Sequence, residues 1–119
     1  MREKPRDPAR LEHIIKAIDN VFNFVDGKNK EDLEMESMLY FAVVKNIEII
    51  GEAAYMITHD FKKNHPDTPW KQIEGMRHVL VHDYYRISVN EVWGVILNRL
   101  IPLRAQVIEY IAELNSNPI

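Results

Sequence analysis

The stretch from Asp32 to Lys63 constrains the fold most strongly, because its apolar residues recur at helical spacing on two faces. One face carries Met35, Met38, Leu39, Ala42, Ile49, Ala53 and Ile57, and the other carries Val43, Ile47, Ile50, Ala54 and Phe61. A helix that is apolar on two faces packs against neighbours on both. We therefore predict one long central helix. Its polar residues are expected to face a groove, an interface or solvent: Asn46, Glu48, Glu52 and Tyr55.

A glycine lies in the middle of this predicted helix, at Gly51. Glycine at such a position costs about 1 kcal/mol relative to alanine. Either a second helix crosses closely at this point, or the position simply tolerates glycine.

A helix is also predicted before the central stretch. Asp7-Pro8 combines an N-cap acceptor with a proline, which is typical of a helix start, and Gly27 marks the end. The apolar residues between these points recur at steps of three and four: Leu11, Ile14, Ile15, Ile18, Phe22 and Val25.

The C-terminal half predicts two or three further helices. After a break over residues 64–69, Thr68-Pro69 begins one helix, and Ser88 begins the next with Glu91 completing a capping box. Pro102 interrupts the apolar pattern, which predicts a kink or a break into a final helix over residues 103–114. Since no strand-like alternation occurs, we predict an all-α, up-and-down bundle of four to five helices, in one domain over residues 1–119.

Composition limits the function classes open to the chain. The 119 residues are 46% hydrophobic and 28% charged, as in an ordinary globular domain, and they include no cysteine for a disulfide or a thiolate metal site. The sequence shows neither a signal peptide nor a membrane span, so we expect a cytoplasmic protein without membrane contact. The net charge of −3 argues against binding nucleic acid over a broad surface, and confines any such contact to a groove.

The segment Met76–Ile87 holds the residues best suited to chemistry, Arg77, His82 and Tyr84. Histidine titrates near neutral pH, so His82 can accept and donate a proton. Arginine is permanently charged and matches phosphate oxygens, so Arg77 can hold a phosphodiester and its developing charge. A histidine and an arginine suffice to cleave RNA without a metal ion, with the 2′-hydroxyl as nucleophile.

The spacing of Arg77 and His82 adds a geometric constraint. Five residues on an ideal helix separate them by about 140° and by about 7.5 Å along the axis. They converge on one phosphate only if the helix ends between them or if a second copy supplies the missing partner. A homodimer with two motifs facing across a twofold axis meets this requirement.

Structural explanations of these residues stay open beside the catalytic one. Arg77 can form a simple ion pair with Glu74 or Asp83, and His82 can be a structural histidine at a helix end. Tyr84, from its pattern alone, can be a half-buried aromatic residue.

A metal site is a further alternative. His78 and His82 lie four residues apart, as in a two-histidine metal pair, and a third ligand would come from His59, His65 or Glu52. Because no glutamate adjoins His78 as in zinc peptidases, we expect no metal site.

The motif and its surroundings resemble the HepT-like toxins of the HEPN superfamily. Residues 75–87 read Gly-Met-Arg-His-Val-Leu-Val-His-Asp-Tyr-Tyr-Arg-Ile and are similar to the Arg…His-x-Tyr hallmark of that family. Residues 42–54 resemble its central helix, and Thr68–Ile73 and Val92-Trp93 also fit. The resemblance covers about Leu11 to Leu114.

The resemblance implies a homodimeric toxin of a type VII toxin–antitoxin pair that acts as a metal-independent endoribonuclease. Its antitoxin would be a minimal nucleotidyltransferase, which silences the toxin by transferring AMP from ATP to the motif tyrosine. By position, Arg77 and His82 are the catalytic pair and Tyr84 is the AMPylated residue, with no cofactor apart from this ATP-derived AMP. His78 and Glu52 are expected to be supporting residues.

Two rival functions belong to other classes. The chain can be a non-catalytic helical dimer that binds a nucleotidyltransferase and is its substrate at Tyr84. It can also be a purely structural dimer, since the central helix is apolar on two sides.

Overall fold

The computed structural model describes residues 7–79 and 89–116. Its elements in chain order are α1 (Asp7–Val25), α2 (Lys30–Met35), α3 (Ser37–Met56), α4 (His59–Asn64), α5 (Trp70–Val79), α6 (Val89–Val95), the π-helix η1 (Ile96–Leu100) and α7 (Ile101–Asn115). These ranges contain no β-strand, and none of their helices is long and apolar enough to cross a membrane. The predicted all-α class is confirmed.

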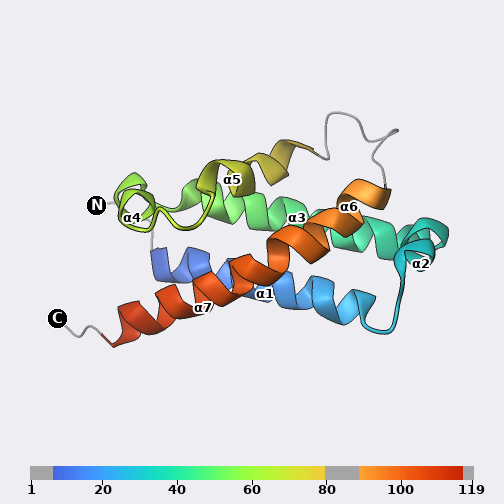
Figure 1. Cartoon of the computed structure of the whole chain (residues 1–119), viewed down its shortest axis with the longest axis horizontal. Helices are drawn as coiled ribbons and strands as arrows, with labels where there is room; N and C mark the ends of the chain where they lie inside the picture. Colours follow the sequence, from blue (N-terminus) through green and yellow to red (C-terminus); the bar gives the residue numbers. More distant parts are fainter. Residues whose placement is uncertain (1–6, 80–88, 117–119) are drawn as a thin grey trace.

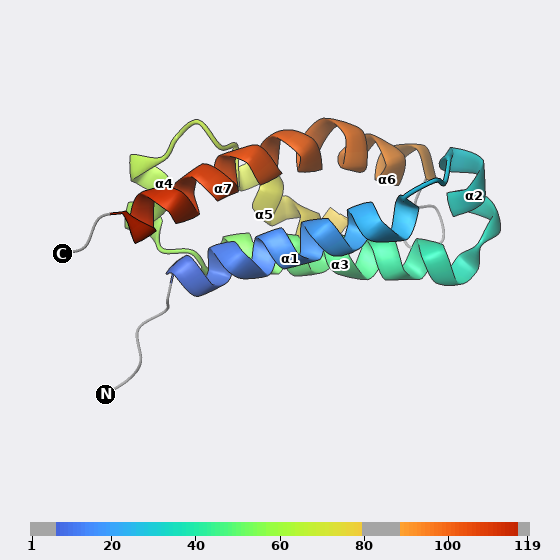
Figure 2. The ribbon, with the colours of Figure 1, turned by 90° about the horizontal axis from the view of Figure 1, so that it is seen from below.

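The long helices run alternately up and down the molecule (Figure 1). α1 and α3 lie side by side, α5 packs on α3, and α6, η1 and α7 form one continuous rod whose C-terminal part packs on α1. Figure 2 shows α1 and α3 on one side of the bundle and this rod on the other. The short helices α2 and α4 lie at opposite ends, so the predicted up-and-down bundle is confirmed. The predicted homodimer stays a prediction.

The prediction of one unbroken central helix is wrong, because residues 32–63 form parts of three helices. Glu36 adopts an extended backbone (φ −107°, ψ 98°) between α2 and α3, and Ile57 does so (φ −69°, ψ 144°) after α3. Asn29 caps α2 in a capping box, and the Thr58 hydroxyl accepts a hydrogen bond from the Phe61 N–H at 3.3 Å. These caps satisfy N–H groups at the helix starts, which lets short helices begin there.

Pro102 does not break the C-terminal helix. A proline ring lacks an N–H and clashes with the carbonyl one turn earlier, so an ordinary helix bends or breaks there. The five residues of η1 end two positions before Pro102 and form a π-helix, whose wider turn accommodates the proline within a continuous rod. The irregularity that Pro102 predicted is therefore a π-helix within a continuous rod, not a break between two helices.

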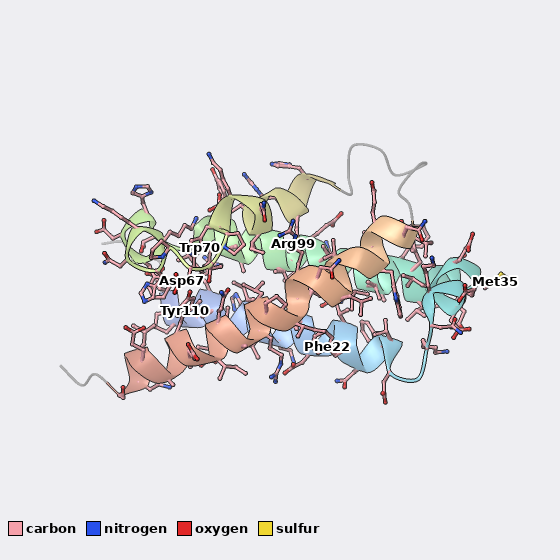
Figure 3. All side chains as sticks on the ribbon, viewed as in Figure 1. Phe22, Met35, Asp67, Trp70, Arg99 and Tyr110 are labelled. Atoms are coloured by element: carbon pink, nitrogen blue, oxygen red, sulfur yellow. The ribbon has the colours of Figure 1, made fainter. Side chains whose placement is uncertain are left out.

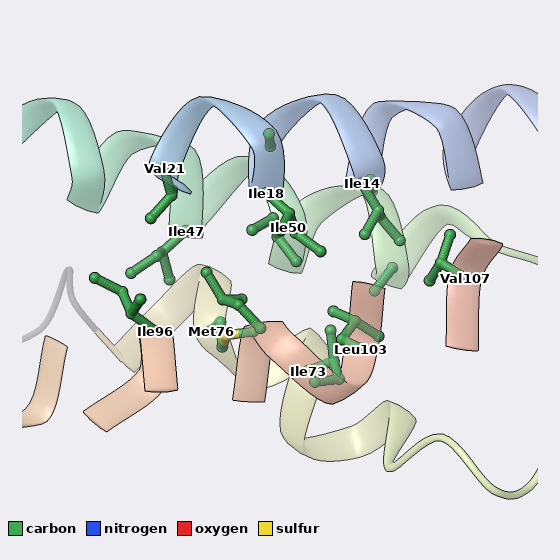
Figure 4. Close-up of a cluster of buried hydrophobic side chains, with 14 of the residues drawn as sticks. Ile14, Ile18, Val21, Ile47, Ile50, Ile73, Met76, Ile96, Leu103 and Val107 are labelled. Carbon is green, nitrogen blue, oxygen red and sulfur yellow. The ribbon is translucent and has the colours of Figure 1, made fainter. Parts of the chain in front are cut away.

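The long segments meet in one hydrophobic core (Figure 4). Its labelled residues come from α1, α3, α5, η1 and α7, and they are Ile14, Ile18, Val21, Ile47, Ile50, Ile73, Met76, Ile96, Leu103 and Val107. All of them are at most 5% exposed. Burial of this many aliphatic side chains is the main force that holds α5 and the rod onto α1 and α3.

Asn46 is buried inside the bundle, which corrects the prediction that it faces a groove, an interface or solvent. Its amide group donates to the Ala42 carbonyl at 2.9 Å and accepts from Asn20 Nδ2 at 3.1 Å. Because both halves of the amide are satisfied, its burial between α1 and α3 is tolerated.

Aromatic and polar side chains close the end of the bundle near α4 (Figure 3). This end cluster consists of Phe61, His65, Thr68, Trp70 and Tyr110. Tyr110 Oη lies 2.6 Å from Thr68 Oγ1, which donates to Gln106 at 2.8 Å, and Trp70 Nε1 donates to the His65 carbonyl at 2.8 Å. The Thr68 side chain, which the sequence placed at the start of α5, thus bonds within this network.

Candidate functional site

The crossing of α3 and α5 at Gly51 positions the candidate site. A Cβ atom built on Gly51 would lie 3.0 Å from Arg77 Cα and 3.0 Å from the Met76 carbonyl carbon, and closer still to the Arg77 backbone nitrogen. Any side chain at this position would therefore push α5 away. Of the two explanations offered for Gly51, a close helix crossing is confirmed.

The side chain of Arg77 lies over the exposed side of α3. Its guanidinium carbon is 3.5 Å from the ring centroid of Tyr55, a cation–π contact, and Nη1 is 3.7 Å from Glu52 Oε1. The Arg77 side chain is 25% exposed, and that of Glu52 is 59% exposed. Tyr55 and Glu52 thus hold the arginine without enclosing it.

One donor of this arginine is unsatisfied. Nε of Arg77 is buried and has no hydrogen-bond partner within the described part of the chain. A buried donor without a partner costs free energy, and the cost is greater for a charged group. In the end cluster, by contrast, the side-chain polar groups of Thr68, Trp70 and Tyr110 have hydrogen-bond partners. The unsatisfied donor therefore distinguishes the surroundings of Arg77 from that cluster.

A cavity of about 250 Å³ opens beside the arginine and is lined by Lys45, Glu48, Ile49, Glu52 and Arg77. We call these five residues together with Tyr55 the arginine site. Its ionic contact to Glu52 is long and exposed, and such pairs contribute little stability. A phosphate group can therefore displace the Glu52 carboxylate and bind the guanidinium through two oxygens.

The structure brings together some of the predicted site residues. Arg77 and Glu52 form an ion pair, and His78 lies exposed in the last turn of α5. His82 and Tyr84 lie outside the described residues, so their predicted roles stay predictions. The contact between Tyr55 and Arg77 was not predicted from the sequence.

The spacing of Lys45, Glu52 and Tyr55 in the sequence could have indicated that they lie close together. Tyr55 is three residues beyond Glu52, and Lys45 is seven residues before it, so the three share one side of a helix. The sequence could not tell which neighbouring helix lies against that side.

Of the residues named for the alternative metal site, His82 lies outside the described residues and His65 is already engaged in hydrogen bonds. Both ring nitrogens of His65 already have partners, the Phe61 carbonyl at 2.8 Å and Glu113 Oε1 at 3.1 Å. Within residues 7–79 and 89–116, no three His, Asp or Glu side chains are grouped to hold a metal ion.

A second cavity, of about 540 Å³, lies where α5 faces α6 and η1. Met76, Gly75 and Gly94 line it, together with Ile47 on α3. The consecutive residues Met76 and Arg77 therefore border different cavities, and the arginine site is separate from this larger space.

The chain is similar to proteins named as ribonucleases. A protein of Caldanaerobacter subterraneus subsp. tengcongensis named "Putative RNase" is 36% identical over 83% of this chain and 88% of its own length. One of Thermococcus cleftensis named "Probable ribonuclease HepT" is 37% identical, over 72% of this chain and 78% of its own. A third, from Methanocaldococcus jannaschii, is named "Gamma-glutamylcyclotransferase and putative RNase"; it is 28% identical over 90% of this chain, which spans only 48% of that protein.

The family comparison covers most of the bundle. No solved structure matches the chain. The family described as "Ribonuclease HepT-like" matches residues 14–110, a range that runs from α1 into α7 and includes Gly51, Glu52, Tyr55 and Arg77. The chain belongs to the HepT-like ribonuclease family.

Proposed function

We propose that the protein is a metal-independent endoribonuclease of the HEPN type, the toxin of a toxin–antitoxin pair. The observation that carries the proposal is the arginine site: a guanidinium held over Tyr55 with a buried, unpartnered Nε and a weak, exposed contact to Glu52. An arginine held in this way is suited to accept a phosphodiester. Membership of the HepT-like ribonuclease family supports RNA as its source.

In this proposal Arg77 binds the phosphate and His82 moves the proton. His82 removes the proton of a 2′-hydroxyl, and the oxygen forms a bond to the adjacent phosphorus while the bond to the 5′-oxygen breaks. The departing 5′-oxygen takes up a proton, and the products are a cyclic 2′,3′-phosphate end and a 5′-hydroxyl end. Arg77 stabilises the additional negative charge on the phosphate oxygens in the transition state.

Glu52 and Tyr55 are positioning residues in this mechanism. The Tyr55 ring supports one face of the guanidinium, so the donors along its edge stay available to phosphate. Glu52 holds the arginine when RNA is absent and gives way to the phosphate when RNA binds. His78 lies exposed in the same part of α5 and is a supporting residue in this proposal.

Regulation and assembly complete the proposal. The protein acts as a homodimer in which two copies of the motif share one groove. A minimal nucleotidyltransferase antitoxin catalyses attack of the Tyr84 hydroxyl on the α-phosphorus of ATP, which forms a tyrosyl–AMP bond and releases pyrophosphate. The bulky, charged AMP then blocks the groove. The protein itself needs no bound cofactor for cleavage.

The test is a cleavage assay on total RNA in the presence of EDTA. We expect the unmodified protein to cut, and Arg77→Ala and His82→Ala each to reduce the rate by about a hundredfold or more. Arg99→Ala is the matched control, because Arg99 is exposed, bonds Gln72 and lies outside the arginine site. Unchanged cleavage by a folded Arg77→Ala protein would refute the nuclease assignment.

The rival function, a non-catalytic substrate of a nucleotidyltransferase, is distinguished by intact mass. With the partner enzyme and ATP, both functions predict a mass increase of one or more AMP units that Tyr84→Phe abolishes and the neighbouring Tyr85→Phe does not. Only the nuclease function also predicts RNA cleavage by the unmodified protein, followed by its loss on modification.

A further inference from the structure

One side of α3 exposes large apolar residues although the helix packs against α1, α2 and α5. The exposed fractions are 86% for Met38, 64% for Phe41, 48% for Tyr55, 39% for Ile49 and 37% for Met56. Lys45 and Glu52 lie on the same side, and the buried residues of α3 occupy the opposite side. We call the exposed residues 38, 41, 45, 49, 52 and 56 the α3 face. An exposed face with this many large apolar residues marks a contact surface.

We propose that the α3 face binds the same face of a second copy, with the two α3 helices antiparallel across a twofold axis between residues 48 and 49. This inference rests on the proposed function, which requires a homodimer, and assigns its surface and register. In this register Phe41 packs on the partner's Met56, and Lys45 pairs with the partner's Glu52. Each contact occurs twice, as a twofold axis demands.

The charges on the α3 face are complementary to those of a second, antiparallel copy of the same face. Each α3 face carries one exposed cation, Lys45, and one exposed anion, Glu52, seven residues apart. An antiparallel partner in this register matches them with opposite charges at both ends. A parallel partner would place lysine against lysine and glutamate against glutamate, which is unfavourable. The apolar residues Phe41 and Met56 flank the charged pairs and exclude water from them.

The symmetry of this dimer brings the two arginine sites together. A twofold axis between antiparallel helices keeps both α5 helices on the same side of the pair. The Arg77 backbone lies level with Gly51, so its copy lies level with residue 46, about 7.5 Å away along the helix axis. Both arginines therefore border one groove.

The second copy also contributes a residue to each site. The partner's Lys45 reaches Glu52, the residue that pairs with Arg77 in the described chain. Once Glu52 is shared with a lysine of the partner, it binds Arg77 less tightly, and the guanidinium is freer to accept phosphate. The arginine site of one chain is incomplete without this cation.

The α3 helices alone do not make a full interface. Residues 41–56 overlap along about 24 Å of helix. One helix face of this length buries less surface than the roughly 800 Å² per partner that stable dimers bury. Met38, at 86% exposure, then extends the contact toward position 59 in the first turn of the partner's α4.

The test is charge reversal followed by mixing, with full-length chains measured by sedimentation equilibrium and native mass spectrometry. Lys45→Glu alone places two glutamates in each contact, and Glu52→Lys alone places two lysines there. Each variant alone is expected to raise the dimer dissociation constant by about tenfold or more. An equimolar mixture restores both pairs, so heterodimers should form with nearly wild-type affinity.

Matched controls keep the test specific. Lys16→Glu on α1 and Glu109→Lys on α7 reverse exposed charges outside the α3 face and are expected to leave the dissociation constant unchanged. Phe41→Ser removes apolar contact at an exposed position, so it should weaken the dimer without unfolding the chain. Circular dichroism confirms folding in each case.

Three results would each overturn the proposed surface. They are single variants that dimerise like the wild type, a mixture that forms no more dimer than its components, and a wild-type chain that stays monomeric. RNA cleavage by the same preparations separates this inference from the proposed function. If the dissociation constants change with charge reversal as expected but the protein does not cleave RNA, only the nuclease function is refuted. If the protein cleaves RNA but charge reversal leaves the dissociation constants unchanged, only the proposed surface is refuted.

Discussion

The two ends of α5 lie in polar environments that differ in how far their hydrogen-bonding groups are satisfied. At its start, the end cluster links Tyr110, Thr68 and Gln106 through contacts of 2.6 and 2.8 Å, and the Trp70 indole donates at 2.8 Å. In its last turns, Arg77 makes one 3.7 Å ionic contact and leaves Nε without a partner among the described residues.

This difference separates a structural network from the site that we propose binds phosphate. A satisfied, buried network adds stability and fixes one arrangement of the helices. An unsatisfied charged donor costs stability, and a sequence that retains it commonly does so for function. The end cluster is therefore expected to respond to mutation in stability alone, and the arginine site in RNA cleavage.

The largest expected effect is that of Gly51→Val, which tests whether the arginine site depends on the helix crossing. A side chain here meets the backbone of Met76 and Arg77, so α5 must shift. We expect a loss of about 1–3 kcal/mol in the free energy of unfolding, measured by urea denaturation, together with loss of RNA cleavage.

Gly75→Ala is the control for this substitution, because a Cβ atom on Gly75 has no neighbour within 4 Å. Alanine is the better helix former, so this variant should gain up to about 1 kcal/mol. Equal effects of the two changes would show that the crossing is not tight, and the account of Gly51 given above would fail.

Much of the fold followed from spacing in the sequence, whereas the details of the site did not. Apolar residues that recur every three or four positions predicted α1, α3, α5 and the C-terminal rod, because the buried face of an amphipathic helix is apolar. The breaks at Glu36 and Ile57 lacked a proline or glycine, so the apolar pattern continued across them. Thr58 is a typical N-cap residue and does cap α4, but the apolar pattern over residues 32–63 predicted a continuous helix there.

Tertiary partners account for the remaining differences. The sequence marks Asn46 as a polar residue on α3 but cannot show that Asn20, 26 residues earlier, lies opposite. Likewise, Gly51 suggested a crossing without identifying α5 as the helix that crosses. Such contacts depend on the angle and offset between helices, which helical periodicity does not determine.

A smaller effect is expected for Tyr110→Phe, which tests the end cluster. The change removes the hydroxyl that bonds Thr68 and keeps the ring packed between Phe61 and Trp70. We expect a loss of about 1 kcal/mol in the free energy of unfolding and no change in RNA cleavage. Reduced cleavage at unchanged stability would contradict the separation of the two regions.

The arginine site is tested by Tyr55→Ala, which removes the ring beneath the guanidinium. Cation–π contacts at exposed sites contribute about 0.5–1 kcal/mol, so we expect a two- to fivefold loss in kcat/KM with little change in stability. Tyr55→Phe keeps the ring and should cleave like the wild type. If the phenylalanine variant lost as much activity as the alanine variant, the hydroxyl and not the ring would be the contributing group.

The smallest expected effect is a loss of stability at high pH that originates in the end cluster. Burial, aided by the nearby carboxylates of Asp67, Glu109 and Glu113, raises the pKa of Tyr110 above its ordinary value of 10.0, although the Thr68 hydrogen bond opposes the shift. The folded protein therefore keeps this proton to higher pH than the unfolded chain does. The contribution of Tyr110 is complete below pH 10.0 and is lost as the pH rises through the raised pKa. Urea denaturation of the wild type and of Tyr110→Phe across this range should show a steeper loss for the wild type, because phenylalanine has no proton to release. Parallel losses in the two proteins would place the alkaline sensitivity elsewhere, and Tyr40, whose pKa is also raised by burial, would be the next tyrosine to replace.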